Sequence, residues 1–317
     1  MTQTAFFLVG ATATGKSDLA LRLARRFALD TIVSADSMNV YTGMDVGTSK
    51  PTAQARSEVR HVGMDICTPD AHCSVGVWLE AVQTICAANN NVDSRKPLIV
   101  AGGTGLYVSA LLHGLDDLPP VPAEVRAHWQ AVGEGEGGLE ALQTSLKNQS
   151  PAWFDALDDR ANRRRLQRAL ELVAVGVTTP PDGWGLAHAR VAGLTGLRMQ
   201  RPALYERINA RAKQMFEEGL IEEAAALLQR YPCLSDTALK AIGYAEAFAA
   251  VRGDCSQPDA VEQTAIRTRR LAKRQGTWFE NQFDVDWVDV EQQSVDDIED
   301  RVANTWQSVG PVALPTL

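Results

Sequence analysis

The feature that most restricts the fold of this chain is a glycine-rich loop near the N-terminus. Residues 10–17 read GATATGKS and fit the pattern G-x-x-x-x-G-K-[ST], with an apolar run before them and a segment of helical spacing after them. This context predicts a phosphate-binding loop, in which backbone N–H groups and a helix N-terminus hold a di- or triphosphate. Lys16 would neutralise phosphate oxygens, and Ser17 would help to hold Mg²⁺. The residues expected to contact the phosphates are Gly10, Ala11, Thr12, Ala13, Thr14, Gly15, Lys16 and Ser17.

Apolar runs alternate with helical patterns over the first third of the chain. After AFFLV at residues 5–9, the runs TIVSA (31–35) and PLIVA (97–101) are further strand candidates, and a helical pattern spans 75–89. Such alternation predicts an α/β fold with a parallel sheet, in which ligands bind at the carboxyl ends of the strands. Each run ends in a polar or glycine-rich turn, so we expect the three turns to meet at one site.

The chain changes character after Gly114. The segment DDLPPVP at 116–122 breaks the pattern, and helical spacing follows, including one helix expected over 151–176. We interpret residues 115–199 as a mostly helical insertion domain, in which 188–200 carry only a weak strand signal. Residues 1–114 and 200–317 would form the P-loop core, which is helical from Arg201 to about Asn281 and again at about 291–309.

Charge and cysteine content narrow the class of function. A net charge of −8 over 317 residues argues mildly against nucleic-acid binding, yet residues 160–168 carry five arginines and 267–274 carry four arginines and a lysine, with no acid in either segment. Two such patches suit a docked polyanion, although each alone is more often a solvated helix face. Five cysteines without a CxxC pattern, and the lack of a signal peptide or a membrane-length apolar run, predict a cytoplasmic protein with no membrane partner.

The residues near the phosphate loop leave the substrate open. A small-molecule kinase is the default for such a loop, but the strand at 97–101 ends in Gly102-Gly103-Thr104-Gly105, without the aspartate that often holds Mg²⁺ there. The phosphates can therefore belong to something other than a nucleotide. Asp36 follows directly after the strand at 31–35 and could be a general base, a Mg²⁺ ligand or a helix N-cap; the local pattern does not decide between cap and catalyst.

Six segments, in order from residue 6 to about 287, resemble the tRNA dimethylallyltransferases of the bacterial type. They are GATATGKS, VSADSMNVYTGMDVGTSKP (33–51), PLIVAGGTGLYVSALLHGL (97–115), RRLQRALEL (164–172), LKAIGYAEA (239–247) and LAKRQGTWFE (271–280). The resemblance implies a Mg²⁺-dependent transfer of the dimethylallyl group of dimethylallyl diphosphate to N6 of adenosine 37, next to the tRNA anticodon. It also implies a P-loop core with a helical insertion, and an adenine that is flipped out of the anticodon loop into the site.

The same resemblance implies roles for individual residues. Asp36 would accept the N6 proton, Thr104 would hydrogen-bond near the leaving oxygen, and Arg211 would contact the diphosphate. Asp36 and Thr104 would also touch tRNA, and Arg126 is a further candidate contact. The other implied tRNA contacts are Ser37, Met38, Asn39, Arg164, Arg165, Leu166, Gln167, Arg168, Lys240, Ala241, Ile242, Gly243, Tyr244, Ala245, Lys273, Arg274, Gln275, Gly276, Thr277, Trp278, Phe279 and Glu280. Without the resemblance, a solvated helix arginine is the better interpretation of Arg211, and a core aromatic is the better interpretation of Trp278.

Three other classes stay open at this point. An adenylate isopentenyltransferase would prenylate free AMP, ADP or ATP and would need no grip on an anticodon arm, so the two basic patches argue against it. A P-loop kinase would need the missing strand-end aspartate, and a non-catalytic RNA-binding protein would not need a phosphate loop beside Asp36. We expect a monomer, because the sequence shows no dimerisation heptads.

Overall fold

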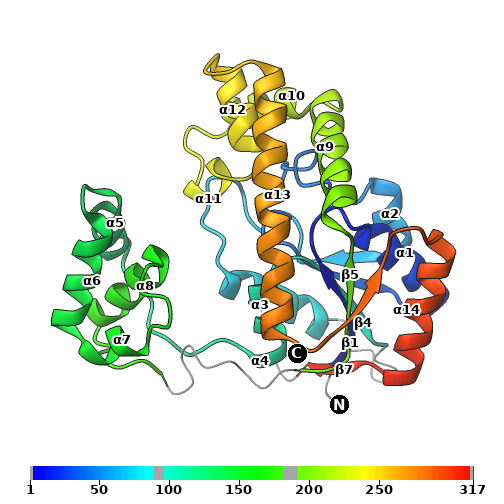
Figure 1. Ribbon diagram of the computed structural model, residues 1–317, viewed down its shortest axis with the longest axis horizontal. Coiled ribbons are helices and arrows are strands. Elements are labelled where there is room, and N and C mark those ends of the chain that lie inside the picture. Colours follow the sequence, from blue (N-terminus) through cyan, green and yellow to red (C-terminus); the bar gives the residue numbers. More distant parts are fainter. Residues whose placement is uncertain (1–2, 89–95, 182–190, 315–316) are drawn as a thin grey trace. The chain divides into compact units, whose positions relative to one another are not determined.

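The computed structural model describes residues 3–88, 96–181, 191–314 and 317. It divides into two compact units, one made of Met1–Gly114 and Arg190–Leu317 and the other of Leu115–Ala189 (Figure 1). Each unit has hydrophobic clusters of its own. Among the described residues, no helix is both long and apolar enough to cross a bilayer. All five cysteines are free thiols, as the sequence predicts.

The first unit is built on a seven-stranded sheet with the order β3-β2-β4-β1-β5-β6. Neighbours along this order are parallel, and β7 adds to β1 in the antiparallel direction. The predicted parallel α/β class is therefore confirmed. The strands are β1 (Gln3–Gly10), β2 (Thr31–Ala35), β3 (Arg60–Val62), β4 (Leu98–Gly102), β5 (Leu194–Arg198), β6 (Val285–Asp289) and β7 (Val312–Leu314).

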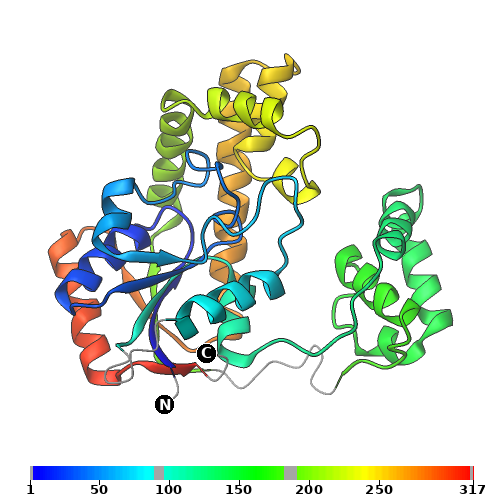
Figure 2. The same cartoon turned by 180° about the vertical axis from the view of Figure 1, so that it is seen from behind.

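Side chains of β1 alternate between two hydrophobic clusters, one on each face of the sheet. Phe6 and Leu8 pack with α1 (Lys16–Arg26) and α14 (Val295–Val309), which lie side by side in both views, coloured dark blue and red in Figure 2. Phe7 belongs to the cluster on the other face. Since both faces are buried, the central strands read as continuous apolar runs, which is why they were recognisable in the sequence.

The other helices of the first unit complete the core and extend beyond one end of the sheet. The long helix α13 contacts α9, α12 and β1 (Figure 1). Besides α1 and α14, the helices of the first unit are α2 (Ala53–Glu58), α3 (Val75–Ala88), α4 (Gly105–His113), α9 (Arg201–Glu217), α10 (Leu220–Arg230), α11 (Asp236–Leu239), α12 (Tyr244–Arg252) and α13 (Gln257–Gln282).

The second unit is a small helical cluster with its own core. Trp153 is fully buried there, and its indole N–H donates to the Val177 carbonyl at 2.7 Å. The single helix predicted over 151–176 is wrong, because the chain turns before Asn162, whose side chain caps a new helix by accepting the Arg165 N–H. The helices of this unit are α5 (Ala123–Glu134), α6 (Gly138–Gln149), α7 (Pro151–Ala156) and α8 (Arg163–Ala174).

The return from the insertion to the core comes earlier in the chain than the expected boundary at residue 199. Strand β5 lies between β1 and β6 in the sheet, so it belongs to the first unit. Its sequence, LTGLR, has Thr195 and Gly196 in the middle of a buried strand, which weakens the apolar signal. Strands β6 and β7 were not predicted, because two of the five residues of β6 are aspartates and β7 has only three residues.

Candidate active site

The predicted phosphate loop lies between β1 and α1, as the sequence indicates. Gly10 has φ 135°, and a Cβ there would lie 2.4 Å from the Leu197 carbonyl oxygen of β5, so only glycine fits. Gly15 is left-handed at φ 91° and is the N-cap of α1. Lys16 folds back over the loop, where its Nζ donates to the Ala11 carbonyl. The first turn of α1 therefore presents Lys16 and Ser17 together with free helix N–H groups.

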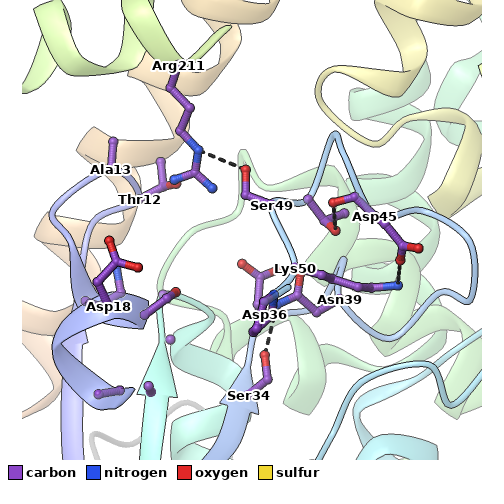
Figure 3. A pocket seen from close by; sticks show the side chains of 18 of the residues that line it. Thr12, Ala13, Asp18, Ser34, Asp36, Asn39, Asp45, Ser49, Lys50 and Arg211 are labelled. Atoms are coloured by element: carbon purple, nitrogen blue, oxygen red, sulfur yellow. Dashed lines mark hydrogen bonds and ion pairs between the residues drawn. The ribbon is translucent and has the colours of Figure 1, made fainter. Parts of the chain in front are cut away.

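One cavity of about 1070 Å³ joins this loop to the turn after β2 and to helix α9 (Figure 3). Lys16 and Ser17 line it from the phosphate loop, Asp36 lines it from the turn after β2, and Arg211 reaches it from α9. In Figure 3, Arg211 extends from its helix toward the space between Thr12 and Ser49. The structure thus brings Arg211, Asp36 and the phosphate loop together. Thr104 does not line this cavity.

Burial sets the electrostatics of the cavity. Desolvation lowers the pKa of Lys16 from an ordinary value of 10.5 to about 7, with Arg211 adding to the shift and Asp36 opposing it. Desolvation also lowers the pKa of Arg211, against the attraction of Asp36 and Asp18. Two cationic side chains are therefore held in a space that disfavours their charge. A bound polyanion would relieve that cost, which makes the cavity suited to a diphosphate.

Hydrogen bonds join the turns that follow β2 and β4. One carboxylate oxygen of Asp36 accepts the Met38 N–H at 2.9 Å, and the Ser37 N–H donates to Oγ1 of Thr104 at 3.0 Å. The Thr104 N–H in turn donates to the Ala35 carbonyl at 2.9 Å. No helix begins at Asp36, so the helix-cap interpretation of this residue is wrong. Asp36 instead closes a tight Asx-type turn at the edge of the cavity.

The donor set fits Mg²⁺ bound together with a diphosphate. In the described part of the chain, no three His, Cys, Asp or Glu side chains gather as a metal site would require. Ser17, Asp18 and Asp36 do line the same cavity and offer oxygen atoms. Because Mg²⁺ is usually held by one or two protein oxygens plus substrate phosphates and water, this sparse set is sufficient for it.

Helix α13 carries both exposed cations and internal contacts. Lys273 and Arg274 are exposed, as is Lys240 before α12. Lys240 also pairs with Asp236 at 3.3 Å. Arg267, from the same basic patch, is instead paired with Glu246 and donates to the Lys240 carbonyl at 2.7 Å. The patch at 267–274 is therefore only partly available to a polyanion.

Several residues expected to touch tRNA have buried side chains. Phe279 and Tyr244 are fully buried in the main core, Ala241 belongs to the same cluster, and Asn39 donates to Ser34 Oγ at 3.1 Å. For Phe279, Tyr244 and Ala241, contact through the side chain is excluded, because each side chain is enclosed by protein. Their neighbours differ in exposure. Thr277 and Glu280 are exposed, Ile242, Ala245 and Gly276 are half-buried, and Gly243 is buried.

Trp278 and Gln275 pack toward the glycine-rich turn after β4. The Trp278 ring lies against Gly105, where an added Cβ would be 1.9 Å from the ring, so the core interpretation of Trp278 holds. Gln275 accepts the Thr12 N–H at 2.8 Å and thereby bonds to the phosphate loop. The sequence did not suggest this contact, because the two residues lie 263 positions apart.

The basic patch of the second unit, at residues 160–168, also contains both exposed and internally bonded side chains. Arg164 and Arg165 are exposed on α8, and Arg126 is exposed on α5. Leu166 is buried in the core of this unit, so its side chain cannot reach a ligand. Two further polar members of the patch have internal partners: Gln167 donates to the Trp129 carbonyl at 3.2 Å, and Arg168 pairs with the buried Glu171 at 3.3 Å.

Three loop and helix residues of the site were missed by sequence reasoning. Ser49 accepts the Arg211 Nε–H at 3.1 Å, Lys50 is buried in an ion-pair network, and Glu223 binds the backbone of the loop that carries both. No local signal marks them, because each contact joins segments far apart in the chain.

Comparison with known proteins finds a family model and several relatives that match most of the chain. Residues 39–282 match the sequence profile of the family described as IPP transferase. A tRNA dimethylallyltransferase 2 of Geotalea uraniireducens is 39% identical over 287 residues, which are 89% of this chain and 91% of the relative. A tRNA dimethylallyltransferase of Shouchella clausii is 38% identical over 288 residues, covering 90% and 91%. The crystal structure of the full-length tRNA isopentenylpyrophosphate transferase of Bacillus halodurans matches with a TM-score of 0.65 and 32% identity over 96% of this chain and 97% of that one.

Proposed function

The chain belongs to the IPP transferase family, and from that membership we propose that it is a tRNA dimethylallyltransferase. In this proposal it transfers the dimethylallyl group of dimethylallyl diphosphate to N6 of adenosine 37 in the anticodon loop of tRNA. The observation that carries it is the cavity in which two half-buried cations, Lys16 and Arg211, lie with the carboxylate of Asp36. A transferase that expels diphosphate and removes a proton needs these two kinds of group together.

The phosphate loop and the two cations would hold the donor. The backbone N–H groups at the start of α1 point toward the cavity and favour an anion there. Lys16 regains its charge when a diphosphate binds, and Arg211 can bind phosphate oxygens through the nitrogens that Ser49 leaves unused. As the C–O bond of the donor breaks, its electron pair leaves with the diphosphate. These groups stabilise the charge that develops there.

Asp36 would take the proton from the acceptor nitrogen. The bond from Met38 occupies one of its carboxylate oxygens, and the other can accept the N6 proton as the new N–C bond forms. Thr104 holds this turn, because its Oγ1 accepts the Ser37 N–H. The Thr104 hydroxyl also contacts Ser37 Oγ at 3.4 Å, so it steadies the turn that carries Asp36.

Ser17 would contribute a ligand to Mg²⁺, with Asp18 or Asp36 near enough in the cavity to add another oxygen. When bound, the ion would neutralise charge on the departing diphosphate. The protein itself supplies the orientation of the phosphates and the base.

Exposed cations would bind the tRNA. In the first unit these are Lys240, Lys273 and Arg274, and in the second unit Arg126, Arg164 and Arg165. Such residues would contact phosphates and hold the anticodon arm, while the adenine leaves its stack to reach Asp36. An enzyme that acts on free AMP would need none of these six side chains.

The first experiment is a transfer assay with labelled dimethylallyl diphosphate and Mg²⁺. The acceptors are unmodified tRNA with adenosines at positions 36–38, the same tRNA with A37→G, and AMP. Label on the first tRNA alone supports the proposal. Label on AMP would assign the chain to the adenylate isopentenyltransferases. ATP turnover without any prenyl transfer would assign it to the kinases.

A further inference from the structure

Two side chains from the C-terminal helices hold the backbone of the loop at residues 45–47. The carboxylate of Glu223, on α10, accepts the Asp45 N–H at 3.2 Å and the Val46 N–H at 3.1 Å. The Tyr244 hydroxyl, at the start of α12, donates to the same carboxylate and accepts the Gly47 N–H at 3.2 Å. Three consecutive amides of the loop are thus bound by one Glu–Tyr pair.

This contact is closely packed. Tyr244 is fully buried, and a Cβ on Gly47 would lie 2.5 Å from its ring. Burial and the neighbouring Glu223 raise the pKa of Tyr244, so the hydroxyl keeps its proton and remains the donor to the carboxylate. The loop therefore has little freedom to shift relative to α10 and α12.

The far end of the same loop is also held. The side chain of Lys50 is only 1% exposed. Its ammonium group binds Asp65 at 2.6 Å and Asp45 at 2.8 Å. Between the two anchors lies Ser49, in the left-handed conformation at φ 49°. An L-residue adopts that conformation at a cost, so the anchors on both sides determine where the Ser49 hydroxyl lies.

Ser49 is the point at which the loop meets the cavity. Its Oγ accepts the Nε–H of Arg211 at 3.1 Å, and this bond turns the rest of the guanidinium toward the cavity (Figure 3). Arg211 is planar and rigid at its tip, so fixing Nε fixes the directions of the remaining N–H groups. The position of the cation on its ligand then depends on the loop.

We propose that Glu223 and Tyr244 are positioning residues for Arg211, acting through the 45–49 loop to orient its guanidinium on the donor diphosphate. The inference rests on the proposed function for the identity of the ligand. Neither side chain lines the cavity, so neither is expected to touch the substrate. Their effect should appear in diphosphate affinity, because a guanidinium displaced by an ångström loses much of its directed hydrogen bonding.

The test is a double-mutant cycle on the full chain, with inorganic pyrophosphate as the probe and isothermal calorimetry as the measurement. We expect Arg211→Ala to weaken pyrophosphate binding about 10- to 100-fold, the range for loss of a hydrogen-bonded charge. Glu223→Gln and Tyr244→Phe should each weaken it about 5- to 10-fold. In the Arg211→Ala background, Glu223→Gln should change the affinity by no more than about two-fold, because the group it orients is gone.

Glu222→Gln is the matched control. Glu222 precedes Glu223 on α10 and its side chain is exposed, so its substitution should leave both pyrophosphate affinity and melting temperature unchanged. Tyr244→Phe is the milder variant should Glu223→Gln fail to fold. The proposal is overturned if both variants bind pyrophosphate within two-fold of the wild type, or if Glu223→Gln has the same effect with and without Arg211.

The kinetic counterpart separates this inference from the proposed function. Glu223→Gln should raise the KM for dimethylallyl diphosphate while leaving the KM for tRNA unchanged. If the wild-type protein transfers no prenyl group but the pyrophosphate cycle is non-additive, the proposed function fails and the positioning role stands. If the wild-type protein is active and the cycle is additive, the positioning role alone fails.

Discussion

At the scale of single residues, the site depends on charges that the fold makes costly. Lys16 lies in a cavity that lowers its pKa to about 7, and Arg211 shares that cavity. Neither cation has a carboxylate bonded to it in the hydrogen bonds of the described residues. The charge state of Lys16 should therefore depend on whether an anion is bound.

Diphosphate binding should be coupled to proton uptake by Lys16. At pH 8 the free protein has Lys16 mostly neutral, because its pKa is about 7, whereas a bound diphosphate raises that pKa and the amine gains a proton. Calorimetry of pyrophosphate binding in buffers of different ionisation enthalpy should show uptake of close to one proton at pH 8, and much less at pH 6. Affinity should fall as the pH rises above 7.

Lys16→Met is the control for this proton. It removes the titrating amine and leaves the titration of pyrophosphate itself, so the difference between the two proteins reports Lys16 alone. Equal proton uptake by the wild type and Lys16→Met would show that Lys16 is already charged in the free protein.

Substitution of Asp36 should separate chemistry from binding. Asp36→Asn keeps the shape of the side chain and an oxygen for the Met38 N–H, but it cannot accept a proton. We expect kcat to fall about 10²–10⁴-fold with tRNA affinity nearly unchanged, as for loss of a general base. Single-turnover transfer and filter binding measure the two quantities. Activity within a few-fold of the wild type would remove Asp36 from the role of base.

At the scale of elements, the charge pattern of a helix indicates a patch but not which of its members are available. On α8, Arg164 and Arg165 are exposed, although Arg164 lies 3.9 Å from the buried Glu171, and Arg168 pairs with the same carboxylate at 3.3 Å. On α13, Arg267 pairs with Glu246, and Arg269 contacts Asn209. A count of arginines in the sequence therefore overestimates the cations that a polyanion can meet.

Arg164 and Arg165, two of the three exposed arginines of α8, should account for much of the salt dependence of tRNA binding. Replacing both in Arg164→Gln/Arg165→Gln should lower tRNA affinity and reduce the slope of log K against log salt by up to about two phosphate contacts. Binding titrations over a range of salt concentration provide the slope. Pyrophosphate affinity should not change.

Lys147→Gln/Arg160→Gln is the matched control for that variant. It removes the same amount of charge from the same unit, at residues that instead lie over the Phe154 ring. Equal slopes for the two double variants would indicate a general charge effect and would contradict a specific role for α8.

Elements also show why some strands could be predicted and others could not. The runs that became β1, β2 and β4 are apolar over most of their length, because both faces of the sheet are covered. Strand β5 is interrupted by Thr195 and Gly196, and it is a strand because β1 and β6 pair with it on both sides. Pairing with distant segments leaves no trace in a local window of sequence.

At the scale of the whole molecule, the two units have separate cores and are expected to have separate tasks. The second unit packs Trp129 and Trp153 with its buried leucines, and the cavity beside the phosphate loop is lined by residues of the first unit. Diphosphate binding should therefore be retained when the second unit is removed, whereas tRNA binding should be lost.

Replacing residues 116–189 by a short Gly-Ser linker tests this division. We expect the shortened protein to keep pyrophosphate affinity within a few-fold of the wild type and to lose prenyl transfer to tRNA. Circular dichroism and calorimetry test whether the first unit folds and binds pyrophosphate. The transfer assay tests whether the shortened protein still prenylates tRNA. Loss of pyrophosphate binding in a folded variant would contradict the independence of the donor site, and normal transfer would contradict a role of the second unit in tRNA binding.

The monomeric state and cytoplasmic location of the protein stay predictions from the sequence.

The sequence by itself determined the features that depend on local backbone geometry. A strand, a glycine-rich turn and a helix N-terminus make a phosphate loop wherever they occur in that order, and the ends of parallel strands meet at one edge, so Gly10, Lys16 and Asp36 were identifiable without a structure. Tertiary structure alone decided how these groups are held. Thr12 bonds to Gln275 across 263 positions, and Arg211 bonds to Ser49 across 162. Glu223 binds the loop before Ser49 from 178 positions away. Such contacts have no period or motif, because they arise only when packing brings remote helices against a loop.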